Sequence, residues 1–277
     1  MGDVCQRLMA SGDEESSAAL FDEAADMSIG VEMSEEEDWF ERASSEPGEL
    51  DRFFRLPTGK TVRVREISFD DGGLGHSVWD ASVGMSIWLS VNTGVVDGQR
   101  VLELGSGVGF AGMSAQASAG ASSTVLSDFV PGRDYVPAQP LDDPDSDDSL
   151  PDAMQLVDNI DHNLRANGLS ESTDVIGLDW GSCLAESFEA AERFPVVMGT
   201  DLIYQTVDAA ALCAAIVAHT ALDGTCFLMS TPRSGCTGVR DVFKLLEEAG
   251  TLELEDFSLV NEFGASRLVL STWRHSK

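Results

Sequence analysis

Short apolar runs alternate with amphipathic segments from residue 100 to the end of the chain. The run RVLELG at 100–105 predicts a buried strand, and the small-residue segment 109–119 that follows it predicts a helix. The same pattern predicts further strands at 123–128, 174–178, 195–204 and 225–230, and further helices at 152–167, 207–220 and 239–249. Because strands that alternate with helices pair in parallel, we expect an α/β fold with a doubly wound, mostly parallel sheet.

Both ends of this region predict hairpins. The strand-like runs 252–260 and 266–274 have no helix between them, so they predict an antiparallel C-terminal hairpin and bring the sheet to seven strands. Near the start, Pro57-Thr58-Gly59 is a turn signal, and residues 61–65 after it alternate with period two. This predicts an N-terminal hairpin over 53–66.

Charge divides the chain further. The 277 residues include 48 Asp plus Glu and only 17 Lys plus Arg, for a formal net charge of −31. Residues 1–50 are acidic and show no sustained apolar period, which predicts a solvated, disordered tail with one short helix at 34–42. Residues 51–277 are then predicted to form a single domain, interrupted by an acid- and proline-rich loop insertion at 131–152.

Composition excludes several classes of protein. No apolar stretch reaches the 18 residues that a membrane-spanning helix needs, and the N-terminus lacks the features of a secretory signal. We therefore expect a cytoplasmic protein, with the nucleus as the alternative. The 5 cysteines and 4 histidines show no metal-ligand spacing, which predicts no metal site and no disulfide framework. The acidity disfavours nucleic acid and favours a basic macromolecule or a cationic small molecule.

The strongest local signal is the glycine-rich turn that follows the first predicted strand of the sheet. Gly105, Ser106 and Gly107 come directly after it, and glycines there let the backbone turn sharply and a ligand approach. Asp128 ends the next strand, where a carboxylate can accept hydrogen bonds from both hydroxyls of a ribose. The pattern predicts a nucleoside cofactor, with a purely structural turn as the alternative.

The same residues also match a dinucleotide fingerprint, because GVGFAG at 107–112 reads G-x-G-x-x-G. Two features favour a different cofactor. The glycine run starts at Gly105, so Phe110 takes the place of the third glycine, and Glu103 brings a negative charge that a pyrophosphate would disfavour. A cationic sulfonium tolerates that acid. We therefore expect S-adenosylmethionine, with Glu103 among its binding residues and with NAD or FAD as the alternative.

Several motifs together resemble a known family. These are VLELGSGVGFAG at 101–112, Val78-Trp79-Asp80, LDW at 178–180, GTDLIY at 199–204 and Asn-x-x-x-Asn-Gly-Leu at 163–169. They are similar to the Rossmann-like, seven-β-strand S-adenosylmethionine-dependent methyltransferases, and in particular to the protein-lysine methyltransferase branch called methyltransferase family 16. The resemblance spans residues 54–274. Within the branch, LELGSG and LDW look most like members that methylate a translation elongation factor.

The resemblance implies a set of site residues and a partner. The cofactor pocket would be lined by Trp79, Gly105, Ser106, Gly107, Asp128, Trp180 and Thr200. Thr200 departs from the family, which commonly has alanine there. The implied substrate is a protein with an accessible lysine, such as a translation factor or a chaperone. We expect no nucleic-acid partner, no membrane partner and a monomeric state.

Asp201 and Tyr204 are the expected catalytic residues. A lysine amine has a pKa of about 10.4, so it arrives protonated and must lose a proton before it can accept a methyl group. Asp201 would attract the ammonium and orient the amine, and Tyr204 would narrow the channel and accept a hydrogen bond. The structural alternatives are a loop cap for Asp201 and packing for Tyr204. The functional alternatives are a methyltransferase of a small amine or other nitrogen acceptor, and a catalytically silent interaction protein.

Overall fold

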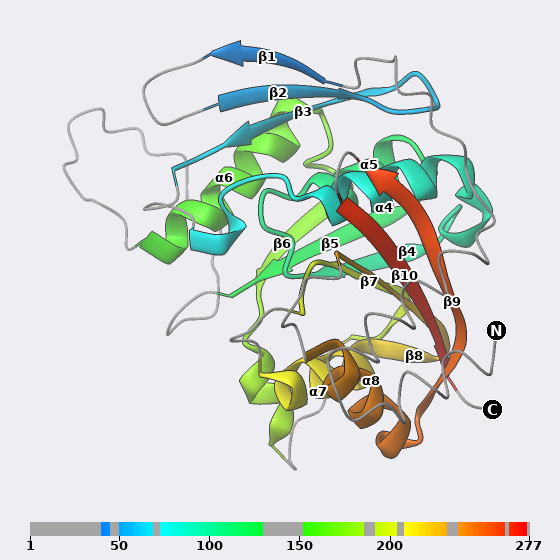
Figure 1. Ribbon diagram of the computed structural model, residues 1–277. Coiled ribbons are helices and arrows are strands. Elements are labelled where there is room, and N and C mark those ends of the chain that lie inside the picture. The colour runs from blue at the N-terminus through cyan, green and yellow to red at the C-terminus, as the bar shows by residue number, and fades with distance from the viewer. Residues whose placement is uncertain are drawn as a thin grey trace. The chain divides into compact units, whose positions relative to one another are not determined.

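The computed structural model describes most of the chain (Figure 1). The described residues are 40–44, 50–68, 73–129, 152–185, 192–203, 208–231, 238–263 and 266–275. Residues 1–39 of the predicted tail, residues 131–151 of the predicted insertion, and Tyr204 lie outside these ranges. Within them, no helix combines the length and the apolar character needed to cross a membrane.

Seven strands form a mixed sheet in the order β6-β5-β4-β7-β8-β10-β9. The strands are β4 (Arg100–Leu104), β5 (Ser123–Asp128), β6 (Thr173–Gly177), β7 (Phe194–Thr200), β8 (Thr220–Ser230), β9 (Leu252–Phe263) and β10 (Ser266–His275). Parallel pairs join β4 to β5, β5 to β6 and β7 to β8, whereas β10 runs antiparallel to both β8 and β9. The predicted α/β fold with an antiparallel C-terminal hairpin is confirmed.

The chain divides into two compact units. The first unit spans residues 37–78 and 89–179. Its elements besides β4–β6 are β1 (Phe40–Ser44), β2 (Leu50–Arg55), β3 (Thr61–Glu66), η1 (Gly73–Gly75), η2 (Thr93–Val95), α5 (Phe110–Ala117) and α6 (Asp152–Ala166). Strands β2 and β3 pair antiparallel through a turn at Gly59, whose φ is 81°. Val62 and Val64 of β3 are fully buried, and the rings of Phe54 and Phe110 lie 4.3 Å apart.

The N-terminal hairpin has a third strand that the sequence did not predict. Phe40 lies opposite Phe54, and Ser44 opposite Leu50, in an antiparallel pair between β1 and β2. The predicted helix at 34–42 is therefore wrong over residues 40–42, and its first six positions lie outside the described residues. The free edge of β2 offers unpaired backbone groups, and pairing with them outweighs the weak local helix preference of this polar segment.

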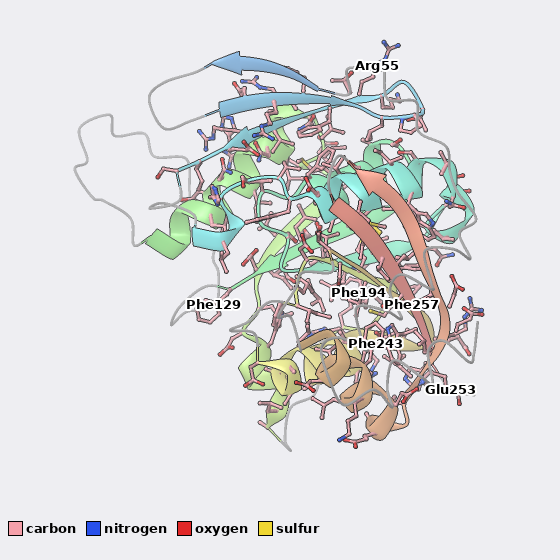
Figure 2. All side chains as sticks on the ribbon, viewed as in Figure 1. Arg55, Phe129, Phe194, Phe243, Glu253 and Phe257 are labelled. Atoms are coloured by element: carbon pink, nitrogen blue, oxygen red, sulfur yellow. The ribbon has the colours of Figure 1, made fainter. Side chains whose placement is uncertain are left out.

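The other unit comprises residues 79–88 and 180–277. Its elements besides β7–β10 are η3 (Trp180–Leu184), α7 (Ala209–His219) and α8 (Gly238–Ala249), and α4 (Asp80–Val91) has most of its residues here. The ring of Phe243 in α8 meets those of Phe257 in β9 and Trp273 in β10 edge-on, with centroids 5.8 and 5.1 Å apart. Phe243 and Phe257 are labelled in Figure 2. Burial of these three rings fixes α8 against the C-terminal hairpin.

Candidate active site

The glycine turn between β4 and α5 has a backbone that only glycine adopts at low cost. Gly105, Gly107 and Gly109 have φ values of 58°, 54° and 84°, in the left-handed region. Gly109 is the N-cap of α5, and its carbonyl accepts a hydrogen bond from Met113 N at 3.0 Å. Gly105 and Gly107 are both partly exposed. The predicted sharp turn is present, and at Gly107 it approaches the backbone of Gly75, where a Cβ would lie 3.3 Å from Gly75 O.

Close packing of α5 onto β5 depends on Gly112. A Cβ at this position would collide with the side chain of Leu126 and lie 2.6 Å from Glu103 Oε2. Tight approach of helix and strand is the third-glycine role of a dinucleotide fingerprint. Gly112 therefore has this role in the structure, although a count that starts at Gly105 places Phe110 at the third position. Phe110 is instead a core residue with 1% of its surface exposed.

Glu103 of β4 is buried against the first turn of α5. Its side chain is 1% exposed, and Oε2 accepts a hydrogen bond from Gly112 N at 2.9 Å. Burial raises the pKa of this carboxyl to about 8, so it is largely protonated at neutral pH. The charge argument against a pyrophosphate is consequently weaker than the sequence suggests. In this geometry Glu103 supports the first turn of α5, and a role in binding a cofactor stays a prediction.

Ser106 ties the turn to the neighbouring strand. Its Oγ accepts a hydrogen bond from Ser127 N at 2.9 Å and donates one to Glu103 O at 3.3 Å. Ser106 N also donates to Ser127 O at 2.9 Å. Ser106 is 7% exposed, so its hydroxyl is used within the protein and sets the spacing between the ends of β4 and β5.

Asp128 lies at the carboxyl end of β5, against the glycine turn. Its Oδ2 accepts a hydrogen bond from Gly107 N, and its Oδ1 accepts one from Phe129 N, each at 2.7 Å. Burial raises the pKa of this carboxyl above its ordinary value. A carboxylate offers about four acceptor positions, so lone pairs remain for two hydroxyl donors. The structure thus brings Asp128 and Gly107 together as the sequence predicts.

Phe129 follows Asp128 directly, and no sequence motif assigns it a role. Its side chain is 54% exposed, although large aromatic side chains are mostly buried in folded proteins. Phe129 is labelled in Figure 2. Phe129 thus offers an exposed apolar ring one residue after the Asp128 carboxylate, to which its backbone N–H is bonded. The signal available in the sequence was the aromatic residue directly after the strand-ending acid.

The predicted substrate-side residues lie in the other unit, at the carboxyl ends of β7 and β8. Thr200 ends β7 and is partly exposed. Asp201 has a φ of 51°, and it alone among the described non-glycine residues has a positive φ. Its Oδ1 accepts a hydrogen bond from Thr231 N at 2.7 Å, and its Oδ2 accepts one from Thr231 Oγ1 at 3.0 Å. The carboxylate is therefore held in one orientation by Thr231.

Trp79 and Trp180 belong to the same unit as Asp201. Trp79 precedes α4, and its carbonyl accepts hydrogen bonds from Ser82 N and Val83 N at 2.9 and 3.2 Å. Trp180 begins η3. Both are partly exposed, in contrast to the fully buried Trp273. Among the residues with described positions, no group of three His, Cys, Asp or Glu side chains is arranged to hold a metal ion.

Comparison with known sequences identifies relatives of this chain. Residues 59–137 match the model of a family described as lysine methyltransferase. A protein-lysine N-methyltransferase, EFM3 of Chaetomium thermophilum, is 28% identical over 161 residues, which cover 56% of this chain and 41% of the relative. The protein N-terminal and lysine N-methyltransferase efm7 of Schizosaccharomyces pombe is 24% identical over 135 residues, covering 47% and 44%. The chain thus spans less than half the length of either relative.

Solved structures resemble the fold. The Thermus thermophilus 16S rRNA N2 methyltransferase RsmC, in complex with AdoMet and guanosine, has a TM-score of 0.52 at 18% identity, covering 84% of this chain and 52% of its own. TYW2 of Pyrococcus horikoshii, in complex with MeSAdo, has a TM-score of 0.52 at 9% identity, covering 82% and 72%. At these identities the likeness shows a shared fold, and the match to the lysine methyltransferase family is confined to residues 59–137.

Proposed function

We propose that this chain is an S-adenosylmethionine-dependent methyltransferase that modifies the side-chain nitrogen of a lysine in another protein. One observation carries the proposal: the left-handed glycine turn is hydrogen-bonded to Asp128 inside the segment that matches the lysine methyltransferase family. The names of both curated relatives support the reaction class.

The residues of the first unit fit the proposed cofactor. Gly105 and Gly107 leave the turn without side chains where a nucleoside would approach, and Asp128 keeps lone pairs for the two ribose hydroxyls. The exposed ring of Phe129 would pack against the adenine. S-adenosylmethionine, when bound, supplies a methyl group on a positively charged sulfur that leaves as a neutral thioether.

Asp201 is the proposed substrate-side residue. Thr231 fixes the Asp201 carboxylate, and the left-handed backbone of Asp201 is the kind of strain that concentrates at functional sites. Asp201 would attract the lysine ammonium and orient the nitrogen after it loses a proton to solvent. Trp79, Trp180 and Thr200 remain proposed cofactor-binding residues, and Tyr204 remains a proposed catalytic residue.

The proposed partner is a lysine-rich protein. A net charge of −31 draws a basic protein toward this surface, and a translation factor or a chaperone remains the proposed substrate class. A cytoplasmic location and a monomeric state are proposed with it.

Transfer of labelled methyl groups to lysate proteins tests the proposal. We expect label on lysine side chains with the wild type. With Asp201→Asn, the transfer rate should fall at least about 100-fold. Asparagine keeps the shape of the side chain and is tolerated at a positive φ. Asp223→Asn, at an exposed position of β8, serves as the matched control and should transfer normally. Label on small amines alone would contradict the lysine assignment, and normal transfer by Asp201→Asn would contradict the role of Asp201.

A further inference from the structure

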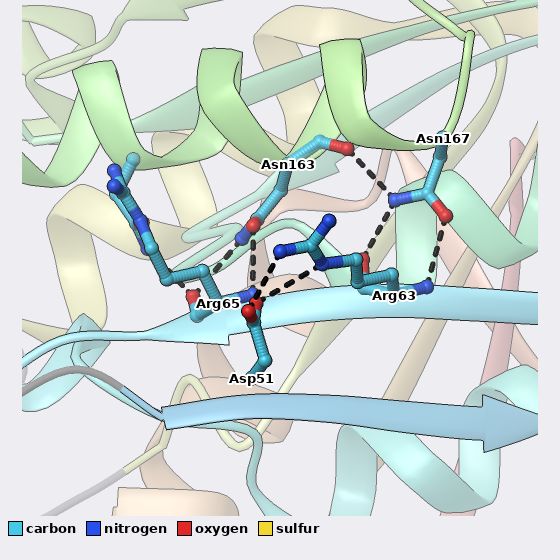
Figure 3. A network of polar contacts seen from close by, with 6 residues as sticks. Asp51, Arg63, Arg65, Asn163 and Asn167 are labelled. Carbon is cyan, nitrogen blue, oxygen red and sulfur yellow. Dashed lines mark hydrogen bonds and ion pairs between the residues drawn. The ribbon is translucent and has the colours of Figure 1, made fainter. Parts of the chain in front are cut away.

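Two asparagines of α6 and a third directly after its last residue form hydrogen bonds to the edge strand β3. Figure 3 shows two of them, Asn163 and Asn167. Asn159 and Asn163 are spaced four residues apart and share one face of α6, and Asn167 follows four residues later, just past the end of the helix. Asn167 Oδ1 accepts a hydrogen bond from Arg63 N at 2.9 Å, and its Nδ2 donates to Arg63 O at 2.6 Å. Asn159 Nδ2 donates to Arg65 O at 2.9 Å. The side-chain amides thus pair with β3 as a neighbouring strand would.

Asn163 forms hydrogen bonds both to β3 and to the glycine turn. Its Oδ1 accepts a hydrogen bond from Arg65 N at 2.8 Å, and its Nδ2 donates to Arg65 O at 3.2 Å. The same Nδ2 donates to Val108 O at 3.0 Å. Val108 is part of the glycine turn, 55 residues earlier in the chain. One fully buried amide therefore joins β3 to the turn.

The turn itself does not fix the orientation of the Val108 carbonyl. Val108 is 2% exposed and lies between Gly107 and Gly109, which both have positive φ. It precedes the N-cap of α5, so no N–H of the helix ladder is directed at its carbonyl. Glycine flanks give the peptide little intrinsic preference for one orientation. The hydrogen bond from Asn163 Nδ2 selects that orientation.

We infer that Asn163 is a positioning residue for the proposed cofactor site. Its amide is fixed on β3 at Arg65 and donates to Val108 O, so that Gly107 N stays directed at Asp128 and the turn keeps its shape. The three-stranded N-terminal sheet is then part of the scaffold of this site. The inference rests on the proposed function for its ligand, but its structural statement about the turn stands independently.

Two variants of Asn163 separate positioning from simple stability. Asn163→Asp keeps the shape and still accepts from Arg65 N, but it cannot donate to Val108 O and places a carboxylate oxygen against that carbonyl. Asn163→Ala removes the donor without this repulsion. Asn167→Asp is the matched control. The Asn167 Nδ2 donates to Arg63 O, Asn163 O and Met113 Sδ, and none of these acceptors belongs to the turn.

Calorimetry with S-adenosylhomocysteine and steady-state kinetics provide the first readout. We expect both Asn163 variants to weaken binding and raise KM for S-adenosylmethionine about tenfold, with kcat changed less than about threefold. Asn167→Asp should lower the melting temperature but leave the affinity within about twofold. Equal loss of affinity in Asn167→Asp, or wild-type affinity in both Asn163 variants, would overturn the inference.

Amide hydrogen exchange of residues 105–112 provides the second readout, without a ligand. Exchange should be faster in Asn163→Ala than in Asn167→Asp or the wild type, because the turn loses its support. Unchanged exchange would overturn the inference. Failure of the wild type to bind S-adenosylhomocysteine would instead overturn the proposed function, so the two failures are distinguishable.

Discussion

At the scale of single residues, the protonation state of Glu103 is the least expected feature. An acid in the strand that leads into the turn suggests a fixed negative charge, yet burial raises the pKa of this carboxyl from 4.5 to about 8. Its contact with Gly112 N opposes that shift without cancelling it. The folded protein therefore prefers the neutral acid, and the unfolded chain prefers the carboxylate above pH 4.5.

This difference predicts a pH dependence of stability. The contribution of Glu103 is fully present below pH 4.5 and is lost as the pH rises toward 8, because the unfolded chain releases the proton first. Glu103→Gln, whose amide oxygen still accepts from Gly112 N, should flatten the decline in unfolding free energy between pH 5.5 and 8. Urea unfolding across this range measures it. Glu171→Gln, at an exposed position, should leave the slope as in the wild type; an equal slope in Glu103→Gln would contradict the assignment.

At the scale of elements, Gly112 sets how closely α5 approaches β5. Gly112→Ala should destabilise the protein by about 1–3 kcal/mol or more, because the added methyl group would overlap Leu126 and crowd Glu103. Gly94→Ala is the control: a Cβ there meets nothing within 4 Å. Urea unfolding of the two variants compares them. Equal stability of both would show that α5 can move away from β5 without cost.

The elements that the sequence predicted well are those with a local signal. The run RVLELG and the period of α6 identify a strand and a helix from their own residues. Strand β1 has no such signal, because its conformation depends on pairing with β2. Element type therefore followed from local pattern, whereas the third strand of the N-terminal sheet required a contact that no single segment reveals.

At the scale of the whole molecule, the site also combines features that follow from local sequence with features that depend on distant contacts. The position of Asp128 beside Gly107 was predictable, since both follow adjacent parallel strands. The contact of Asn163 with Val108 was not, because it joins residues 55 positions apart and depends on how α6 lies. The neutral state of Glu103 likewise depends on burial, which a strand-ending motif does not specify.

Binding of the methyl donor's product tests the central claim most directly. In calorimetry with S-adenosylhomocysteine, the wild type should bind at one site, and Asp128→Asn should bind at least about tenfold more weakly, because the amide accepts fewer hydrogen bonds from the ribose. A purified chain that instead binds NAD or a flavin, and binds no S-adenosylhomocysteine, would contradict the account.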